Sequence, residues 1–327
     1  MRLKSLLLLT AAFATPCSVG FATPVPPSQI TGIVAFGDSL SDTGNASIAT
    51  LGAQPGPGYA TRNVSGVPFP VGYFTNPQVA GGPTGLWIDQ LAAKLGVTDP
   101  SPALAPLGGT NYAIGSAMTG NTNPQDMANQ IALFLASNPT GASASDLYTF
   151  WGGANDIFAG ENPVTAADNI ANEIEAVAAA GGKNFLWLNQ SDLGDVPALS
   201  GTPGAAAAAN LASQAFDLEW ASKVSALNAL GINVIGVNVN TLFNNIQNDP
   251  AAFGLTDVTS ACAITPSCNP NMALYWDAEH PTTQGHALVA DLAFADLAPV
   301  PEPSSLALLG TGVLAAFSMA RRRCLRS

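Results

Sequence analysis

The fold is decided by the stretch Ile30-Thr31-Gly32-Ile33-Val34-Ala35-Phe36, which runs directly into Gly37-Asp38-Ser39-Leu40-Ser41-Asp42-Thr43-Gly44-Asn45. The first, largely apolar part predicts a buried β-strand, and Ser39 comes where that strand ends. A residue at the carboxyl end of a parallel strand lies at the edge of an α/β sheet where ligands bind. Ser39 is therefore the first candidate functional residue.

Further short apolar segments, each followed by Gly or Asn, alternate with segments of helical pattern. This alternation predicts an α/β fold in which helices cover both faces of a parallel sheet. The predicted strands are 30–36, 111–114, 147–151, 185–188 and 232–239, and the predicted helices are 86–95, 126–136, 166–180, 205–230 and 283–297.

Residues 51–85 break this alternation. They are rich in Gly and Pro and carry Tyr59, Phe69, Tyr73 and Phe74. Long loops of this kind are often functional. Two interpretations stay open: the loop forms one wall of an acyl or glycan pocket, or it packs on its own aromatic side chains.

The N-terminal residues 1–22 predict a secretory signal peptide. Arg2 and Lys4 precede an apolar stretch, 6–14, and small residues follow at a plausible cleavage point. The alternative is an N-terminal anchor helix, which the shortness of the apolar stretch disfavours.

The C-terminal residues 299–327 combine a Pro-Glu-Pro sequence at 301–303, an apolar stretch predicted as a transmembrane helix at 304–320, and an Arg-rich tail beginning with Arg321-Arg322-Arg323. The arginines place the end of that helix in the cytoplasm. This order resembles the PEP-CTERM sorting signal. The resemblance implies an exosortase-type processing enzyme as a partner, and export to the cell surface, outer envelope or extracellular matrix of a Gram-negative bacterium. The alternative is a plain C-terminal anchor; in either case membrane contact is expected only through this helix.

Without the two ends the chain is strongly acidic. From Asp38 to Glu302 the only basic residues are Arg62, Lys94, Lys183 and Lys223, against all 22 acidic ones. Such a charge repels nucleic acid and anionic membrane surfaces and favours neutral substrates. No nucleic-acid partner is therefore expected.

Two cysteines, Cys262 and Cys268, remain between the predicted processed ends. In an exported protein two cysteines this close predict a disulfide. No histidine or third cysteine lies close to them in the sequence, so no metal site is expected there.

A serine nucleophile needs a base, and the sequence has only two histidines, His280 and His286. Asp277 lies three residues before His280, a spacing that puts both side chains on one side of a turn. Asp277 is then placed to hold the imidazole tautomer and to stabilise the imidazolium. His286 falls inside the last predicted helix and is interpreted as a packing residue.

Acyl transfer also needs hydrogen-bond donors for a developing oxyanion. Asn155 follows the strand 147–151 and offers its side-chain amide. The exit of the strand 111–114 offers a backbone N–H, and the N–H of Ser39 is a third candidate. All three lie at the same predicted sheet edge.

Four ordered blocks, at 36–45, 111–117, 153–156 and 276–282, resemble those of the GDSL (SGNH) hydrolases, and 72–76, 192–197 and 249–254 resemble the lipase-type branch. The resemblance implies a hydrolase domain over 28–298 with a flavodoxin-like, three-layer αβα sandwich and a five-stranded parallel sheet. It also implies the triad Ser39, Asp277 and His280. For the oxyanion hole it implies Ser39, Asn155 and a glycine N–H, for which Gly115 and Ser116 both remain candidates.

Together these observations predict an exported serine ester hydrolase of the lipase/esterase type, without metal or organic cofactor, that cleaves carboxylic esters through an acyl-enzyme. The substrate is either a lipid ester or an O-acetylated polysaccharide. The alternative is a non-catalytic surface or biofilm-matrix binding protein on the same scaffold, which the sorting signal and the acidic composition motivate. The sequence around Ser39 lacks the Gly-x-Ser-x-Gly elbow of ordinary α/β-hydrolases.

Overall fold

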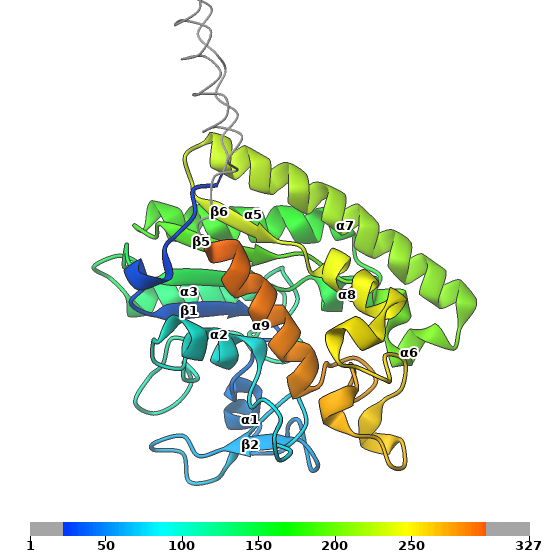
Figure 1. Ribbon diagram of the computed structural model, residues 1–327. Helices are drawn as coiled ribbons and strands as arrows, with labels where there is room; N and C mark the ends of the chain where they lie inside the picture. Colours follow the sequence, from blue (N-terminus) through cyan, green and yellow to red (C-terminus); the bar gives the residue numbers. More distant parts are fainter. Residues whose placement is uncertain (1–21, 299–327) are drawn as a thin grey trace, which may run out of the picture.

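The computed structural model describes residues 22–298, which contain a four-stranded parallel sheet with helices on both faces (Figure 1). The strands β1 (Ile33–Gly37), β4 (Leu147–Trp151), β5 (Asn184–Leu188) and β6 (Val234–Val237) lie in the order β1-β4-β5-β6. Every residue of β1 and β4 is buried, as expected for strands covered on both sides.

Two hydrophobic layers enclose the sheet. One joins it to α2 (Trp87–Leu95), α8 (Val239–Asn248) and α9 (Thr283–Leu297). The other joins it to α3 (Met127–Ser137), α5 (Pro163–Ala179) and α7 (Pro203–Ala229). The result is an αβα sandwich. The ends of α2, α3, α5, α7 and α9 agree with the predicted helices to within three residues.

The prediction of a fifth strand was wrong. Residues 110–114 run beside β1 and exchange hydrogen bonds with it from Thr110, Tyr112 and Ile114, but only Ala35 and Asn111 form a β-bridge. The segment has no regular strand on its outer side. There Asn111 bonds the Ser101 carbonyl and the Ala103 N–H, the Asn45 side chain donates to the carbonyls of Asn111 and Ala113, and a turn follows. Its position still gives the flavodoxin-like order, because residues 110–114 lie on one side of β1 and β4 lies on the other. In this order the connections after neighbouring strands diverge, which leaves a crevice at the carboxyl end of β1.

Residues 51–85 contain a two-stranded antiparallel ribbon of β2 (Ala60–Arg62) and β3 (Val71–Tyr73), next to α1 (Asn45–Ala49). Arg62 fastens this ribbon to the domain: its guanidinium pairs with Asp89 of α2 at 3.0 Å and donates to the Thr43 carbonyl at 2.9 Å. The ribbon is therefore held against the loop that carries Ser39.

The remaining helices are short. They are α4 (Ala154–Phe158), α6 (Pro197–Ser200) and the 3₁₀ turns Pro27–Gln29, Leu193–Asp195, Pro250–Phe253, Cys262–Ile264 and Pro270–Met272. Cys262 and Cys268 are joined by a disulfide. The loop that they close hydrogen-bonds to the carbonyls of Tyr275 and Trp276, directly before Asp277.

Within residues 22–298, none of the helices has the length and apolar character required to cross a membrane. The predicted helix at 304–320 and the Arg-rich tail lie outside the described residues, as do residues 1–21 of the predicted signal peptide.

Candidate active site

The end of β1 is fixed by Gly37. Its φ is +150°, and a Cβ at this position would lie 2.1 Å from the Trp151 carbonyl oxygen of β4, so only glycine fits. The Gln130 side chain of α3 bonds both the N–H and the carbonyl of Gly37, at 3.0 and 2.7 Å. Ser39 follows two residues later and is 9% exposed. A closely packed strand end thus presents Ser39 at the edge of the sheet.

Asp42 holds the loop after Ser39. Its buried carboxylate accepts backbone N–H groups of Gly44, Asn45 and Ala46 and, across the loop, the N–H of Gly115 at 2.8 Å. Burial raises the pKa of Asp42 to about 6, although these four donors oppose the rise. The contact with Gly115 ties the Ser39 loop to the turn that follows residues 110–114.

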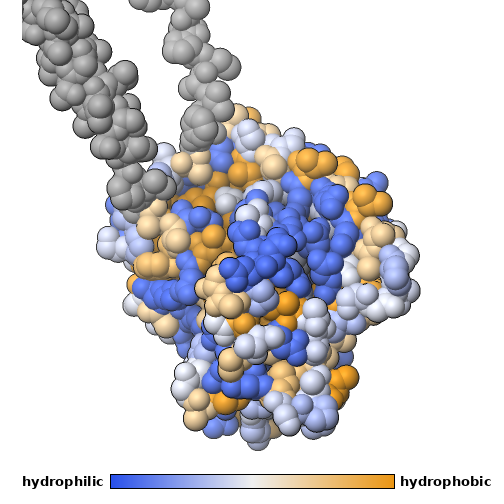
Figure 2. All heavy atoms as spheres, turned by 45° about the vertical axis from the view of Figure 1, so that its right-hand side comes forward, coloured by the Kyte–Doolittle hydropathy of each residue, from blue (hydrophilic) through white to orange (hydrophobic). Residues whose placement is uncertain are grey.

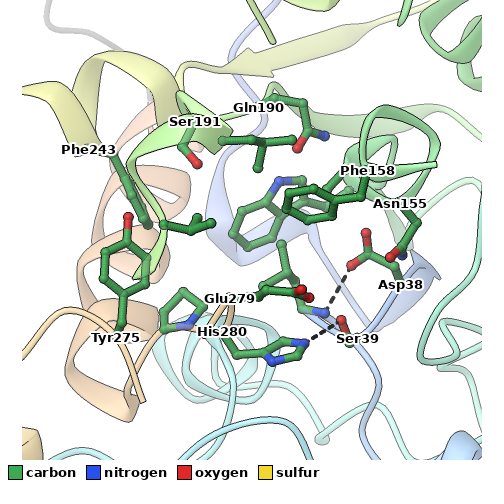
Figure 3. A pocket seen from close by; sticks show the side chains of 16 residues that line it. Asp38, Ser39, Asn155, Phe158, Gln190, Ser191, Phe243, Tyr275, Glu279 and His280 are labelled. Carbon is green, nitrogen blue, oxygen red and sulfur yellow. Dashed lines mark hydrogen bonds between the residues drawn. The ribbon is translucent and has the colours of Figure 1, made fainter. Parts of the chain in front are cut away.

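His280 lies between Ser39 and Asp277. Its Nε2 is 2.8 Å from Ser39 Oγ, and its Nδ1 is 2.8 Å from Asp277 Oδ2 (Figure 3 shows the contact with Ser39). The structure therefore brings the three residues together, although Ser39 and His280 are 241 positions apart in the sequence and Asp277 and His280 are 3 apart. This is the geometry in which a hydroxyl passes its proton to an oriented imidazole.

Electrostatics favour these roles. Burial alone would raise the pKa of Asp277, but the hydrogen bonds and charge of His280 outweigh it and hold that pKa well below its ordinary value. Burial alone would lower the pKa of His280, but the bond to Asp277 and its charge raise it above its ordinary value. Asp277 is thus an anion that favours the imidazolium.

The candidate oxyanion donors meet at the same edge. Asn155, near the start of α4, donates one amide hydrogen to the Ala117 carbonyl at 2.9 Å, which leaves the second for a ligand. The turn Gly115-Ser116 is held between two contacts: Ile114 bonds Gly37 at 3.2 Å on one side, and Ala117 bonds Asn155 on the other.

Gly115 and Ser116 differ in what their N–H groups do. The N–H of Gly115 is used by Asp42. Ser116 is exposed and has a φ of +64°, and among residues 22–298 its N–H has no acceptor. The same holds for the N–H of Ser39 in the described part of the chain. Of the two candidates, the geometry therefore favours Ser116 as the donor.

A pocket opens beside Ser39 and His280 (Figure 3). Its apolar side, called the pocket wall below, consists of Leu40, Phe158, Leu193, Val196 and Phe243. Gln190, Ser191 and Glu279 add polar groups. These residues follow β1, β4, β5 and β6, so the pocket lies along the carboxyl edge of the sheet.

A broad hydrophilic area, bordered by hydrophobic patches, covers the face turned forward in Figure 2. Helix α8 has one apolar and one polar face: Phe243 and Ile246 are buried, while Asn245 and Asn248 are exposed. Phe243 therefore contributes to the pocket wall from the inner face of a helix whose outer face is polar.

Residues 51–85 lie on the other side of the triad and contribute none of the pocket-lining residues. The ring of Phe74 lies 5.0 Å from that of His280, tilted by 32°, and the Tyr59 hydroxyl donates to Asp277 Oδ2 at 2.6 Å. With Trp276, whose ring lies 6.5 Å from that of Tyr59, these residues form what is called the back wall below. The sequence shows both aromatic residues in this loop, but no local pattern indicates their contact with the triad.

His286 takes no part in this site. It is fully buried in α9, burial lowers its pKa to about 3, and neither ring nitrogen has a hydrogen-bond partner among the described residues. Residues 22–298 contain no group of three or more His, Cys, Asp or Glu side chains arranged to hold a metal ion.

The family model for GDSL-like lipases and acylhydrolases matches residues 33–293, which include the whole triad. The chain belongs to the GDSL-like lipase/acylhydrolase family. A second model, the PEP-CTERM protein-sorting motif, matches residues 299–323, which marks an exported protein sorted to the cell surface.

Relatives of this GDSL chain include esterases. Esterase EstA of Pseudomonas aeruginosa is 28% identical, over 92% of this chain and 52% of EstA. A GDSL esterase/lipase of Arabidopsis thaliana is 25% identical, over 86% of this chain and 90% of the relative. The solved structure of a lipolytic G-D-S-L family member from Veillonella parvula aligns with a TM-score of 0.46 at 15% identity, over 81% of this chain and 97% of that one. The chain spans about half the length of relatives such as EstA.

Proposed function

We propose that this GDSL-family protein is an exported serine hydrolase of carboxylic esters that works through an acyl-enzyme on Ser39. The observation that supports this most directly is the continuous chain of contacts from Ser39 Oγ through His280 to Asp277, with both ring contacts at 2.8 Å. A serine hydroxyl is a weak nucleophile until a base takes its proton, and this arrangement supplies the base and the group that orients it.

In the proposed reaction, Ser39 Oγ attacks the ester carbonyl while His280 Nε2 takes the hydroxyl proton. The oxyanion accepts hydrogen bonds from the N–H groups of Ser39 and Ser116 and from the Asn155 amide. His280 then gives its proton to the departing alcohol. A water molecule repeats the sequence on the acyl-enzyme and releases the acid. The base must be neutral at the start, and the pKa of His280 is raised, so activity falls as the pH drops through that pKa.

The pocket wall supports an apolar acyl group rather than an acetyl group on a polysaccharide. Leu193, Val196 and Phe243 are at most 6% exposed and line the pocket beside Ser39 with apolar side chains, which favour contact with an apolar acyl group. The carboxylate of Glu279 at the rim and the acidic charge of the whole chain favour a neutral ester over an anionic one.

Labelling of the purified protein by a fluorophosphonate probe tests the mechanism, with Ser39→Ala as the control. We expect labelling of the native protein and none of the variant, together with a loss of ester hydrolysis by about 10⁴-fold or more. Absence of labelling in a folded native protein would contradict the proposal and favour the surface or biofilm-matrix binding alternative.

A series of esters of one alcohol tests the acyl preference. We expect higher kcat/KM for medium-length acyl chains than for acetate, and little release of acetate from acetylated polysaccharide. The reverse order would point to the polysaccharide as the substrate.

The processing of the ends is also part of the proposal. We expect residues 1–22 to be removed as a signal peptide and an exosortase-type enzyme of a Gram-negative host to cut within 299–327, leaving the hydrolase domain 28–298 at the cell surface or in the matrix. Mass spectrometry of the mature protein from the host would locate both ends, and a mature form that keeps Arg321-Arg322-Arg323 would contradict the cut.

A further inference from the structure

The carboxylate of Asp277 accepts four hydrogen bonds, two on each oxygen. Oδ1 accepts the backbone N–H groups of Glu279 and His280, at 2.8 and 2.7 Å. Oδ2 accepts the His280 ring at 2.8 Å and the Tyr59 hydroxyl at 2.6 Å. Three of the four donors come from the turn that contains Asp277 itself. Tyr59 is the exception, because 218 positions separate it from Asp277.

The segment that carries Tyr59 is fastened to the residues that directly follow His280. The next residue, Ala60, bonds Thr75 through its backbone N–H at 2.9 Å. The Thr75 hydroxyl in turn donates to the Pro281 carbonyl at 3.0 Å, and the Asn76 side chain accepts the N–H of Thr283 at 2.7 Å. Tyr59 is therefore held in place by the same contacts that fix the start of α9 after His280.

The ring of Tyr59 is supported independently of its hydroxyl. It lies edge-on to Phe74 at 6.4 Å and to Trp276 at 6.5 Å. Aromatic pairs of this kind stabilise a packing arrangement through the rings alone. Removal of the hydroxyl oxygen should consequently leave the back wall in place and change only the hydrogen bond to Asp277.

We propose that Tyr59 is a positioning residue of this site, whose hydroxyl fixes the orientation of the Asp277 carboxylate and limits how strongly that carboxylate favours the imidazolium of His280. The two donors on Oδ2 share the negative charge of one oxygen. The hydroxyl draws part of that charge away from the ring. Loss of the hydroxyl leaves His280 facing a more strongly charged acceptor, so His280 binds its proton more tightly.

The hydroxyl keeps its proton over the whole range in which His280 titrates. Burial and the neighbouring Asp277 raise the pKa of Tyr59 above its ordinary value. The other titratable groups around the pair are Asp38 at the end of β1, Glu279 in the turn and His286 in α9. None of these groups forms a hydrogen bond with Tyr59 within the described residues, so Tyr59→Phe removes none of their hydrogen bonds.

The direct test is the titration of His280 by NMR in protein labelled at histidine, in the native protein and in Tyr59→Phe. The sequence contains only two histidines, which makes the assignment simple. Tyr73→Phe is the matched control, because Tyr73 belongs to the same ribbon and lies beside Arg62, away from the triad. We expect the pKa of His280 to rise by about 0.5–1 unit in Tyr59→Phe and to stay unchanged in Tyr73→Phe. An unchanged pKa in a folded Tyr59→Phe protein would overturn the proposal.

Activity gives a second measurement, and this part rests on the proposed ester hydrolysis. We expect the acid limb of kcat/KM against pH to move upward by the same amount as the NMR titration, and kcat at the plateau to fall about 3–10-fold. A fall in activity or stability without movement of the limb would show a merely structural role and overturn the proposal. If His280 shifts as expected but no protein in the set hydrolyses esters, the assignment of Tyr59 stands and the proposed function fails.

Discussion

The triad lies between two walls of opposite character. The pocket wall consists of apolar side chains that follow the strands of the sheet and make no hydrogen bond to Ser39, His280 or Asp277. The back wall consists of Tyr59, Phe74 and Trp276, and it contacts the triad through the Tyr59 hydroxyl and the Phe74 ring. One wall offers surface to a ligand, and the other holds the base and its carboxylate.

This difference suggests that the two walls control separate properties. A change in the pocket wall alters the apolar surface offered to an acyl group, and apolar contacts depend little on pH. A change in the back wall alters the charge that His280 experiences, which moves its pKa and leaves the choice of acyl group unchanged. Substitutions near each wall test whether the two properties are separate.

Among substitutions that leave the triad intact, the largest effect is expected from Asn155→Ala, on the pocket side. It removes the amide that is aimed away from Ala117 and toward the proposed oxyanion, and loss of one such donor costs about 10²–10³-fold in kcat. Because the amide is neutral, the acid limb of the pH profile should stay where it is. Steady-state kinetics over a pH range measure both quantities. A loss of less than about threefold would remove Asn155 from the oxyanion hole.

A medium effect is expected from Phe158→Ala in the pocket wall. Phe158 is 37% exposed at the end of α4, so its truncation should cost little stability. It should lower kcat/KM for medium-length acyl esters by about 3–10-fold and leave acetate esters nearly unchanged, because only the longer chain reaches the ring. Phe158→Leu keeps an apolar side chain and serves as the control. Equal losses for all chain lengths would break the proposed role of this wall.

The smallest effect is expected from Asp38→Asn, which tests the separation itself. Asp38 lines the pocket, yet its charge also favours the imidazolium of His280. Burial raises the pKa of Asp38 to about 7, against the bond from the Leu40 N–H. Asparagine keeps an acceptor for that N–H but carries no charge, so the pKa of His280 should fall and the acid limb should move to lower pH by less than about 0.5 unit. This direction is opposite to that of Tyr59→Phe, and an upward shift would contradict the electrostatic argument.

Much of the site could be predicted because its signals are local. The apolar run before Gly37 marks a strand and its end, and the three-residue spacing of Asp277 and His280 places both side chains on one side of a turn. The prediction of a strand at 111–114 was wrong because strand formation there depends on the neighbouring segments, which the local sequence pattern does not reveal. Its outer neighbours are Pro102 and the Asn45 side chain rather than another strand.

Neighbouring positions in the sequence were enough to predict the α/β alternation and the place of Ser39 at a strand end, and to propose His280 as its base, since hydrophobic period and residue chemistry are local properties. The contacts between distant segments had to come from the folded domain: the N–H of Gly115 is taken by Asp42, while that of Ser116 has no acceptor among residues 22–298. The folded domain alone also brought the Tyr59 hydroxyl to Asp277. These contacts join segments that are far apart in the chain and have irregular backbone. Such segments have no periodic sequence pattern from which their contacts could be predicted. The distances between these groups are therefore set by the packing of the whole domain.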